Sequence, residues 1–466
     1  MKILLINPSQ YELYGGLQAP EHPPMGLSYI GAVLEANADQ VRILDIDADK
    51  ISKDEFINII KTSGFDIVGV TTLTPSFSKA VLLTKIVKEN SSAHTVLGGI
   101  HPTIMPADCL KPDSVDFVII GEGEVTFKEL VNCLKNGHDL SSVTGLGYKK
   151  NGNVIINKER ELIPDLDSLP FPARHLFKNQ NYTYPDALFY PTIPVMTSRG
   201  CPGSCTYCNT KNIFTKRFRA RSALNVVDEF EHLVRKSGAK EIHIWDDNFT
   251  TIKNRVFEIR DEIKRRGLKL KFAFPNGLRI DFVNDEVFKA LKDMGTYSVA
   301  LGVESGNQRI LNRISKNISL EDIRDKFKSA RKAGLEIWAF FMIGLPGETK
   351  DTIADTIKFA IELDPDIAKF HILKPFPGTE VFDELYKDGL ITDMNYDNYG
   401  IHTSPVHRLP TLSENDLLEW QNKAYKMFYL RPKKILFQLR RMSTWNRFKL
   451  NARTGFTLLK KMMVKR

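Results

Sequence analysis

Two stretches of the chain alternate short β-branched runs with amphipathic helical patterns, and this alternation limits the possible folds more than any other feature. The first stretch contains the strand-like runs MKILLINP, VRILDID, DIVGVTT, HTVLGG and DFVIIGEGE. Helical patterns such as GLSYIGAVLEA and VTFKELVNCLKNG accompany them. Such alternation is typical of a parallel sheet with helices on both faces. We therefore predict a doubly wound, Rossmann-like α/β domain over residues 1–138.

A second series of strand-like runs starts near residue 193 and consists of IPVMTS, EIHIW, LKFAFP, YSVALG, EIWAFFMIG and IAKFHIL. Six strands with intervening helices predict a partial (β/α)6 barrel of the TIM type over residues 191–375, with its chemistry at the carboxyl ends of the strands. Residues 139–190 are rich in Pro and Asp and predict a linker that packs between the domains. Residues 376–466 are expected to form a helical region that shapes the substrate site.

The net charge of +9 is concentrated at the C-terminus. Residues 431–466 hold twelve Lys and Arg and no Asp or Glu, so the rest of the chain is slightly acidic. No basic–aromatic RNA-binding pattern is recognisable, and we expect no nucleic-acid partner. No apolar run approaches the roughly 20 residues that cross a bilayer. The opening MKILLINP lacks a cleavage site and is interpreted as a buried strand, so a cytoplasmic location is expected.

The basic tail carries apolar residues at helical spacing, which are Ile435, Leu439, Met442, Trp445 and Phe448. An amphipathic helix with a cationic face is therefore predicted. One interpretation packs this helix over the barrel with its charges in solvent. The other places it on a membrane surface, which would suit a lipid-like substrate.

Three of the five cysteines lie in the segment RGCPGSCTYCN, at Cys201, Cys205 and Cys208. In a reducing compartment, clustered cysteines bind metal more often than they form disulfides. A structural zinc site takes four ligands, but Cys109 and Cys133 occupy apolar positions of the first domain and are predicted to be buried thiols. A [4Fe–4S] cluster held by three thiolates leaves one iron open for a substrate or cofactor. The spacing therefore favours such a cluster over zinc or a disulfide.

The pattern C-x-x-x-C-x-aromatic-C, with Tyr207 at the aromatic position, resembles the signature of the radical S-adenosylmethionine (SAM) superfamily. Its position after the first strand of a partial barrel strengthens the resemblance. The resemblance implies an oxygen-sensitive enzyme whose cluster binds SAM and cleaves it reductively to a 5′-deoxyadenosyl radical. It also implies an electron donor such as flavodoxin or ferredoxin as a partner.

Later strand ends resemble the SAM-binding segments of that superfamily, namely WDDNFT, LGVESGNQRIL and GLPGET. A carboxylate of WDDNFT would pair with the SAM ammonium group, and which Asp does so is open; capping of a helix is the alternative. One interpretation of Arg221 is that it binds the SAM carboxylate. The other is that it is a solvated arginine or one whose charge screens the cluster. The SAM contacts implied by the resemblance are Tyr207, Arg221, Asp246, Asp247, Asn248, Glu304, Ser305, Gly344 and Pro346.

The first domain resembles the cobalamin (B12)-binding domain of the class B radical SAM methylase-like family. The segments that carry this resemblance are NPS, PPMGLSYIGAVLEA, LGGIHPT, IIGEGEVTFKELV and the linker phrase DLDSLPFPARHLF. The GEGE segment is either ligand-lining or an acidic helix N-terminus. The implied cobalamin contacts follow strand ends and are Pro8, Ser9, Thr71, Thr72, Gly98, Gly99, His101, Pro102, Thr103, Gly121, Glu122, Gly123 and Glu124.

The D-x-H-x-x-G motif of cobalamin domains that ligate cobalt by histidine is absent. The nearby histidines are His22 and His101, and a histidine between Ile and Pro is more often a packed loop residue. We therefore expect base-off cobalamin without a histidine ligand, which would alter how readily cobalt releases a methyl group.

Three functions follow from these features. The leading hypothesis is a cobalamin-dependent radical SAM methyltransferase that acts on an unactivated carbon, or on phosphorus, of a small or lipid-like substrate. A second is a radical cyclase or ring-rearranging enzyme, as in formation of the fifth ring of chlorophyll precursors. A third is a metal-stabilised RNA-binding module, although related methylthiotransferases carry a second three-cysteine cluster that this chain lacks. Candidates for a substrate wall are Tyr396, Tyr399, His402 and His407.

Overall fold

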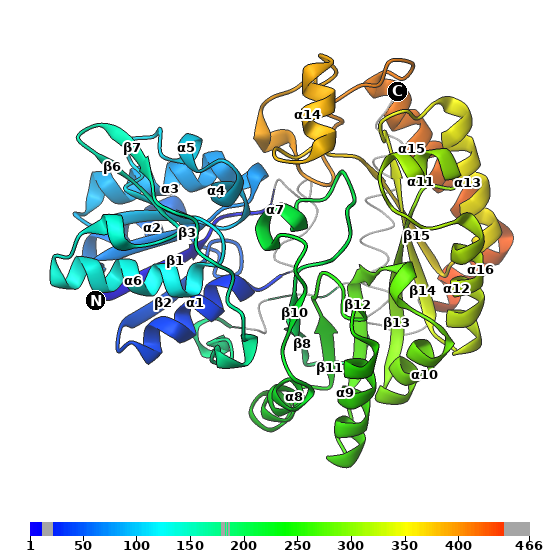
Figure 1. The fold of residues 1–466 in the computed structure, drawn as a ribbon, viewed down its shortest axis with the longest axis horizontal. Helices are drawn as coiled ribbons and strands as arrows, with labels where there is room; N and C mark the ends of the chain where they lie inside the picture. The colour runs from blue at the N-terminus through cyan, green and yellow to red at the C-terminus, as the bar shows by residue number, and fades with distance from the viewer. Residues whose placement is uncertain (12–21, 179–181, 183, 185–186, 442–466) are drawn as a thin grey trace.

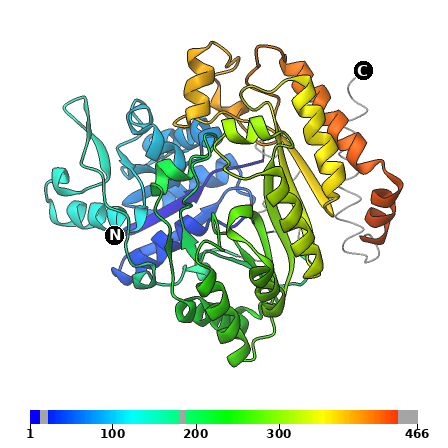
Figure 2. The same ribbon diagram turned by 45° about the vertical axis from the view of Figure 1, so that its right-hand side comes forward.

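Two α/β domains lie side by side in the computed structural model, which describes residues 1–11, 22–178, 182, 184 and 187–441 (Figure 1). The segment that carries α14 (Glu380–Lys387) sits above the junction between them. The helices α15 (Glu414–Tyr429) and α16 (Pro432–Arg441) run along the outer side of the second domain (Figure 2). The predicted order of a Rossmann-like domain, a barrel and a helical C-terminal region is confirmed.

The first domain is built on a seven-stranded sheet in the order β2-β1-β3-β4-β5-β6-β7. Its first five strands are parallel, as expected. They are β1 (Lys2–Asn7), β2 (Gln40–Asp45), β3 (Ile67–Thr71), β4 (His94–Gly98) and β5 (Phe117–Ile119). The helices of this domain are α1 (Met25–Ala36), α2 (Lys53–Ser63), α3 (Phe77–Asn90), α4 (Ile100–Ile104), α5 (Pro106–Cys109) and α6 (Gly123–Asn136).

Helices cover both faces of this sheet because inner strands such as β1 are apolar on both sides. In β1, Leu4 and Ile6 pack with α2 and α3, whereas Ile3 and Leu5 pack with α1 and α6. Successive side chains of a strand point to opposite faces, so a continuous apolar run predicts a strand buried on both. Cys109 belongs to the first of these cores and Cys133 to the second, which confirms both as buried thiols on opposite faces of the sheet.

The sheet continues past residue 138 into the stretch expected to be a linker. The strands β6 (Leu146–Lys150) and β7 (Asn153–Ile156) extend it in the antiparallel sense. Asn151 and Gly152 join them, with φ angles of 54° and 79°. Asn-Gly with two positive φ values is the preferred turn of a tight hairpin, so the sequence contained a signal for this hairpin. The remainder of the expected linker runs between the domains, where the backbone N–H of Ala173 donates to the carbonyl of Ser28.

The second domain is an open barrel of six parallel strands in the order β8-β11-β12-β13-β14-β15. They are β8 (Thr192–Val195), β11 (Glu241–Ile244), β12 (Lys271–Leu278), β13 (Thr296–Glu304), β14 (Glu336–Ile343) and β15 (Ile367–Ile372). The outer helices are α8 (Ala223–Ser237), α9 (Lys253–Arg265), α10 (Asp285–Met294), α11 (Gln308–Arg313), α12 (Leu320–Lys332) and α13 (Lys350–Leu363). The core between strands and helices contains the buried rings of Phe230, Phe272, Phe288, Phe327, Phe341 and Phe370.

The first turns of the basic tail are docked on the barrel. Lys434 is buried and lies 3.0 Å from Asp364, and Phe437 packs against Trp338 and Ile367. This agrees with a packed helix up to Phe437. The tail residues from Met442 onward lie outside the described residues, so membrane contact stays a prediction. No helix in the described parts of the chain is long and apolar enough to cross a membrane.

Candidate functional site

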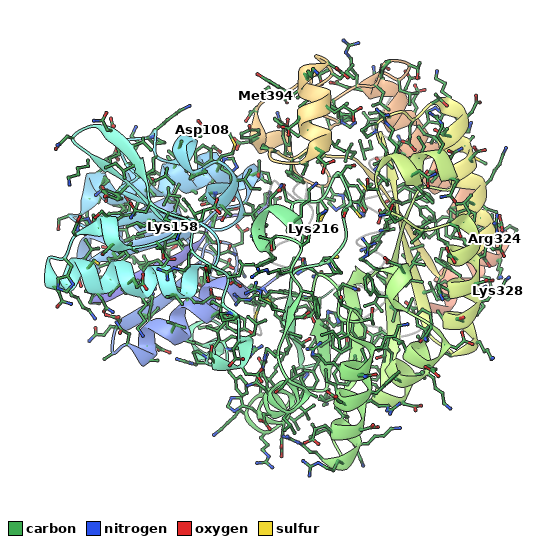
Figure 3. The ribbon with its side chains drawn as sticks, in the orientation of Figure 1. Asp108, Lys158, Lys216, Arg324, Lys328 and Met394 are labelled. Atoms are coloured by element: carbon green, nitrogen blue, oxygen red, sulfur yellow. The ribbon has the colours of Figure 1, made fainter. Side chains whose placement is uncertain are left out.

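The three clustered cysteines lie on a loop that a short ladder closes at its neck. The strands β9 (Ser198–Arg199) and β10 (Arg219–Ala220) pair antiparallel, with Arg199 opposite Arg219. The loop between them contains α7 (Thr210–Phe214) and lies between the two domains, where Figure 3 labels Lys216. Gly200 has a φ of 90°, and a Cβ there would lie 2.2 Å from the carbonyl oxygen of Arg217. Only glycine fits this tight neck.

Hydrogen-bonding groups lie beside all three sulfurs, and Cys208 Sγ is 3.3 Å from the hydroxyl of Thr210. The backbone N–H of Gly203 lies 3.5 Å from Cys201 Sγ, and Nη1 of Arg279 lies 3.3 Å from Cys205 Sγ. A Cβ on Gly203 would lie 2.2 Å from Arg279 Nη1, so the loop and this guanidinium approach as closely as glycine allows. Cys205 is buried, Cys201 and Cys208 are half-buried, and all three are free thiols. Donors and a cation around thiolates stabilise an iron–sulfur cluster.

The spacing of the cysteines suits a cluster better than a single ion. In the described parts of the chain, no three His, Cys, Asp or Glu side chains are arranged to hold one metal ion. A mononuclear zinc site needs its ligands around one point, whereas a cubane takes each thiolate on a different iron. The donor set therefore fits a [4Fe–4S] cluster.

The charge of Arg279 opposes the effect of burial on Cys201. Burial raises the pKa of Cys201 and of Cys208, which disfavours their thiolates. Burial also works against the charge of Arg279, but its hydrogen bonds to Asp281, at 2.7 and 3.0 Å, and the neighbouring thiolates raise the pKa of the guanidinium. Arg279 directly follows β12, and our sequence analysis missed it.

A buried ion pair lies at the end of the fourth barrel strand, and Tyr207 of the cysteine loop contacts it. Glu304, at the end of β13, has a φ of 67° and accepts a hydrogen bond from Lys316 Nζ at 2.8 Å. A Cβ on Gly302 would lie 2.6 Å from Glu304 Oε1, so glycine makes room for this pair. Burial and the Glu304 carboxylate raise the pKa of Tyr207, whose hydroxyl hydrogen-bonds that carboxylate. Lys316 was also missed by sequence reasoning.

The two aspartates of WDDNFT have different surroundings. Asp246 is buried and accepts hydrogen bonds from the backbone N–H and the hydroxyl of Thr197, both at 2.5 Å, and from Ser198 at 2.6 Å. Asp247 is exposed beside the cysteine loop, where it accepts the N–H of Gly200 at 2.9 Å. The carboxylate of Asp246 is therefore occupied by hydrogen bonds within the protein, whereas Asp247 is accessible to a ligand.

The other residues matched to SAM contacts are held by protein partners. The side-chain oxygen of Asn248 accepts the N–H of Arg279 at 3.2 Å, and the Ser305 hydroxyl lies 3.2 Å from that of Thr356. Gly344 accepts a hydrogen bond from His407 at 2.9 Å, and Pro346 is buried.

Arg221 is also engaged by protein groups. It is 5% exposed, pairs with Glu229 and donates to Asn225 at 2.6 Å and to the carbonyl of Met196 at 3.1 Å. Its guanidinium is therefore not solvated. None of its contacts with the described residues is to a sulfur of the three clustered cysteines. A SAM-binding role for Arg221 stays a prediction.

The residues matched to cobalamin contacts follow β1, β3, β4 and β5, which are neighbours in the sheet. Backbone bonds join their loops: Thr72 N–H donates to Gly98 at 2.7 Å, and Gly121 N–H donates to the Thr103 hydroxyl at 3.0 Å. A Cβ on Gly121 would meet nothing within 4 Å, so this edge has room for a ligand. The carboxyl edge of such a sheet is the usual ligand site.

The two nearby histidines are both packed against aromatic rings. His101 is buried between Phe77 and Tyr396, with ring centroids at 4.7 and 5.5 Å. Burial lowers its pKa to about 4, and its ring nitrogens have no hydrogen-bond partner among the described residues. His22 packs 5.0 Å from Trp245. His101 therefore is a packed residue, although it lies in the short helix α4 and not in a loop.

Both glutamates of the GEGE segment are bound by arginines of the barrel domain. Arg199 donates to Glu122 at 2.7 Å and to Glu124 at 2.5 Å, and Arg219 donates to Glu122 at 2.8 and 3.0 Å. The proposed cobalamin-lining role of these glutamates stays a prediction. The arginines were missed because their partners lie far away in the sequence.

The candidate substrate-wall residues also differ in exposure. Tyr399 and His407 are fully buried, and Tyr396 packs against His101. His402 is exposed in the loop that follows.

Comparison with known proteins identifies the family. The model of the radical SAM superfamily matches residues 195–360, and that of the B12 binding domain matches residues 15–131. An uncharacterized methyltransferase of Pyrococcus horikoshii, PH0819, is 37% identical over 438 residues, which cover 94% of each chain. The chain belongs to the B12-binding radical SAM family.

Other members of this family are similar over most of the chain. The cytidylyl-2-hydroxyethylphosphonate methyltransferase of Streptomyces wedmorensis is 30% identical, covering 84% of this chain and 82% of that protein. The radical SAM methyltransferase TsrM of Kitasatospora setae, solved with cobalamin and a [4Fe–4S] cluster, has a TM-score of 0.71 at 19% identity. That match covers 83% of this chain and 78% of TsrM, and it shows a common fold.

Proposed function

We propose that this family member is a cobalamin-dependent radical SAM methyltransferase acting on an unactivated carbon, or on phosphorus, of a small molecule. The observation that carries the proposal is the position of the cysteine loop, whose neck contacts the ligand edge of the B12-binding domain through Glu122 and Glu124. The relatives at 37% and 30% identity are both named methyltransferases, which supports methyl transfer.

The residues of this chain would divide the work as follows. Cys201, Cys205 and Cys208 would hold the cluster, with Arg279 balancing its negative charge. Asp247 would bind the SAM ammonium group, because it is the exposed aspartate beside the loop. Bound cluster, SAM and cobalamin supply a hydrogen-abstracting radical and a transferable methyl group, and the protein orients them and excludes water. A flavodoxin or ferredoxin would deliver the electrons.

The edge of the first sheet would hold cobalamin base-off, without a histidine ligand. Thr71 would provide a hydroxyl and Gly121 space there, whereas the Thr103 hydroxyl donates to the carbonyl of Gly99 and joins the loops. The absence of the D-x-H-x-x-G motif from the sequence supports this state.

The substrate would bind on the concave side of the barrel, near β14 and β15. A Cβ on Gly277 of β12 would lie 3.5 Å from the ring of Phe340, two strands away, which places Phe340 on that side. Lys369 Nζ lies 4.8 Å from the centroid of Trp338 and 5.6 Å from that of Phe340. Lys369 has no carboxylate partner among the described residues, so we infer that the substrate carries an anionic group.

Transfer of label from methyl-labelled SAM tests this function. The anaerobically reconstituted holoenzyme would be given a panel of phosphates, phosphonates and carboxylates together with their neutral analogues. A methyltransferase places the labelled methyl group in the product, whereas a cyclase consumes SAM without doing so. The similarity to the anaerobic magnesium-protoporphyrin IX monomethyl ester cyclase of Cereibacter sphaeroides, 29% identical over 94% of this chain, makes a cyclase the alternative that this experiment tests.

A further inference from the structure

Four buried charges meet where the two domains touch. The carboxylate of Glu122 binds both Arg199 and Arg219, and the carboxylate of Glu124 binds Arg199, at 2.5 to 3.0 Å. The two arginines and two glutamates balance in charge, and Glu122, Glu124 and Arg199 are all less than one-tenth exposed. Burial disfavours the ionised form of Glu122, but the two arginines lower its pKa. We name these four residues the junction network.

The junction network holds both strands at the neck of the cysteine loop. Arg199 and Arg219 are opposite residues of the β9–β10 ladder, and Arg199 lies two positions before Cys201. Tethering both therefore fixes both ends of the loop. A loop held at one end would still pivot, whereas a loop held at both ends keeps its orientation.

On the other side, the network belongs to the ligand edge of the B12-binding domain. Glu122 immediately precedes α6, and Glu124 lies in its first turn, just beyond the end of β5. The N-terminus of a helix favours negative charge, so these carboxylates are well placed there before any arginine is added. The network therefore joins the loop of one cofactor to the binding edge of the other.

Two further groups brace the network. The ring of Tyr29 in α1 lies 5.4 Å from the guanidinium of Arg199, and its hydroxyl donates to the carbonyl of Met196 at 3.4 Å. Ile163 of the linker donates its N–H to Glu122 at 2.7 Å and accepts from Arg219 at 2.6 Å. Both oxygens of Glu122 are thus occupied by protein donors, which leaves this carboxylate poorly suited to bind a ligand as well.

We propose that Glu122, Glu124, Arg199 and Arg219 are positioning residues that set the distance and orientation between the cluster and cobalamin. This inference rests on the proposed function, since it assumes that both cofactors bind. Misplacing reacting groups by about 1 Å costs on the order of 10²-fold in rate, so a rigid junction matters for transfer between two cofactors. If these ion pairs only stabilised the fold, their loss would lower the fraction of folded protein. The distance between the two cofactors in each folded molecule would then stay the same.

The test is a distance measurement by pulsed electron paramagnetic resonance. In holoenzyme that contains cob(II)alamin and the reduced cluster, the dipolar coupling between the two spins reports their separation. The variant Glu124→Gln removes one charge and keeps the shape of the side chain. The control is Glu362→Gln, which breaks the exposed pair with Arg324 on the outer face of the barrel, at 2.5 Å (Figure 3).

The expected result is one narrow distance distribution in the wild type and the control, and a distribution at least twice as broad in Glu124→Gln with iron and cobalt retained. Amide exchange of residues 198–203 should also rise about tenfold in that variant. An unchanged distribution and unchanged exchange would overturn the proposal. If Glu124→Gln loses a cofactor, the same two measurements are made on Arg219→Lys. This variant keeps the charge but loses the two hydrogen bonds from the guanidinium to Glu122.

Failure of the proposed function would look different. Wild-type protein that takes up the cluster but no cobalamin would give no second spin, and it would refute the function rather than the junction network. Amide exchange would then still show whether Glu124 holds the neck of the loop.

Discussion

Arg279 places its guanidinium 3.3 Å from the sulfur of Cys205, although 74 positions separate the two residues in the chain. The strand β12 ends at Leu278, so Arg279 is directed across the carboxyl end of the barrel toward the cysteine loop. A cation and hydrogen-bond donor at this point favours the more negative, reduced state of a thiolate-bound cluster.

Replacing Arg279 should therefore lower the reduction potential of the cluster. In Arg279→Met we expect a fall of about 60 mV, a tenfold change in the equilibrium of a one-electron couple. Redox titration of the anaerobic holoenzyme measures it. Arg279→Lys keeps the charge, so its cluster should have a reduction potential close to that of the wild type. Equal reduction potentials in the wild type and Arg279→Met would contradict the role given to this residue.

The two aspartates of WDDNFT should separate into a structural and a ligand-binding residue. Asp246→Asn leaves buried donors poorly satisfied, which costs about 1–3 kcal/mol and lowers the melting temperature by several degrees. Asp247→Asn should keep the melting temperature and weaken SAM binding about tenfold or more, because it removes a charge-assisted contact. Thermal denaturation and equilibrium dialysis with labelled SAM measure the two effects. The assignment fails if Asp246→Asn alone weakens SAM binding without loss of stability.

Substitutions of the buried pair Glu304 and Lys316 should have strongly non-additive effects on the free energy of unfolding. Removal of one partner leaves an uncompensated buried charge, which typically destabilises a protein by about 3–5 kcal/mol. We expect such a loss in Lys316→Met and partial recovery in the double variant Lys316→Met/Glu304→Gln. Urea denaturation of the holoenzyme gives the free energies of unfolding. Additive losses in the double variant would show that the two side chains act independently.

Glu348 should make stability depend on pH. Burial raises its pKa to about 8 from the 4.5 of an unperturbed glutamate, although Gly344 and Leu345 donate backbone N–H groups to it at 2.7 and 3.0 Å. Because the folded pKa is raised, this stabilisation is complete below about pH 4.5 and is lost as pH rises through about 8, by at most about 1.4 kcal/mol per unit.

Denaturation at pH 6 and pH 9 checks this prediction. Wild-type stability should fall between the two values, and it should fall less in Glu348→Gln, whose amide carries no charge. Glu419→Gln, an exposed change on α15, should behave as the wild type does. Identical pH dependence in all three proteins would rule out Glu348 as the cause.

Lys369 should determine the preference for anionic substrates. Lys369→Met keeps the aliphatic packing on Trp338 but removes the charge, so methyl transfer to anionic substrates should fall about tenfold or more, with little change in SAM cleavage without substrate. The matched control is Lys423→Met, because Lys423 lies over Trp420 on the outer helix α15, at 4.1 Å from the ring centroid. Equal losses in both variants would argue against an anion site on the concave face.

Local patterns predicted the elements of this protein well. The apolar run KILLIN and the alternation that follows gave the parallel strands, and the three cysteines gave the cluster loop. The hairpin of β6 and β7 was missed although its Asn151-Gly152 turn was visible, because both strands are short and β7 is mostly exposed. Its discovery moves the end of the first domain well beyond residue 138.

Partners across the domain junction were beyond the reach of sequence patterns. Arg199 lies 77 positions from Glu122, and Arg219 lies 97 positions from it. Periodicity reports which face of a helix or strand is apolar, but it does not report which distant charge a carboxylate meets. The acidic GEGE segment could therefore be recognised as special while its arginine partners could not.

Above all, we propose that this chain binds a three-thiolate cluster and cobalamin together. The most direct test of this proposal is the iron and cobalt content of protein purified and reconstituted without oxygen, beside the variant in which Cys201, Cys205 and Cys208 are all alanine. We predict about four irons and one cobalt per chain in the wild type, and loss of the iron but not the cobalt in the variant. Zinc in place of iron, or iron retained without the three cysteines, would contradict the account.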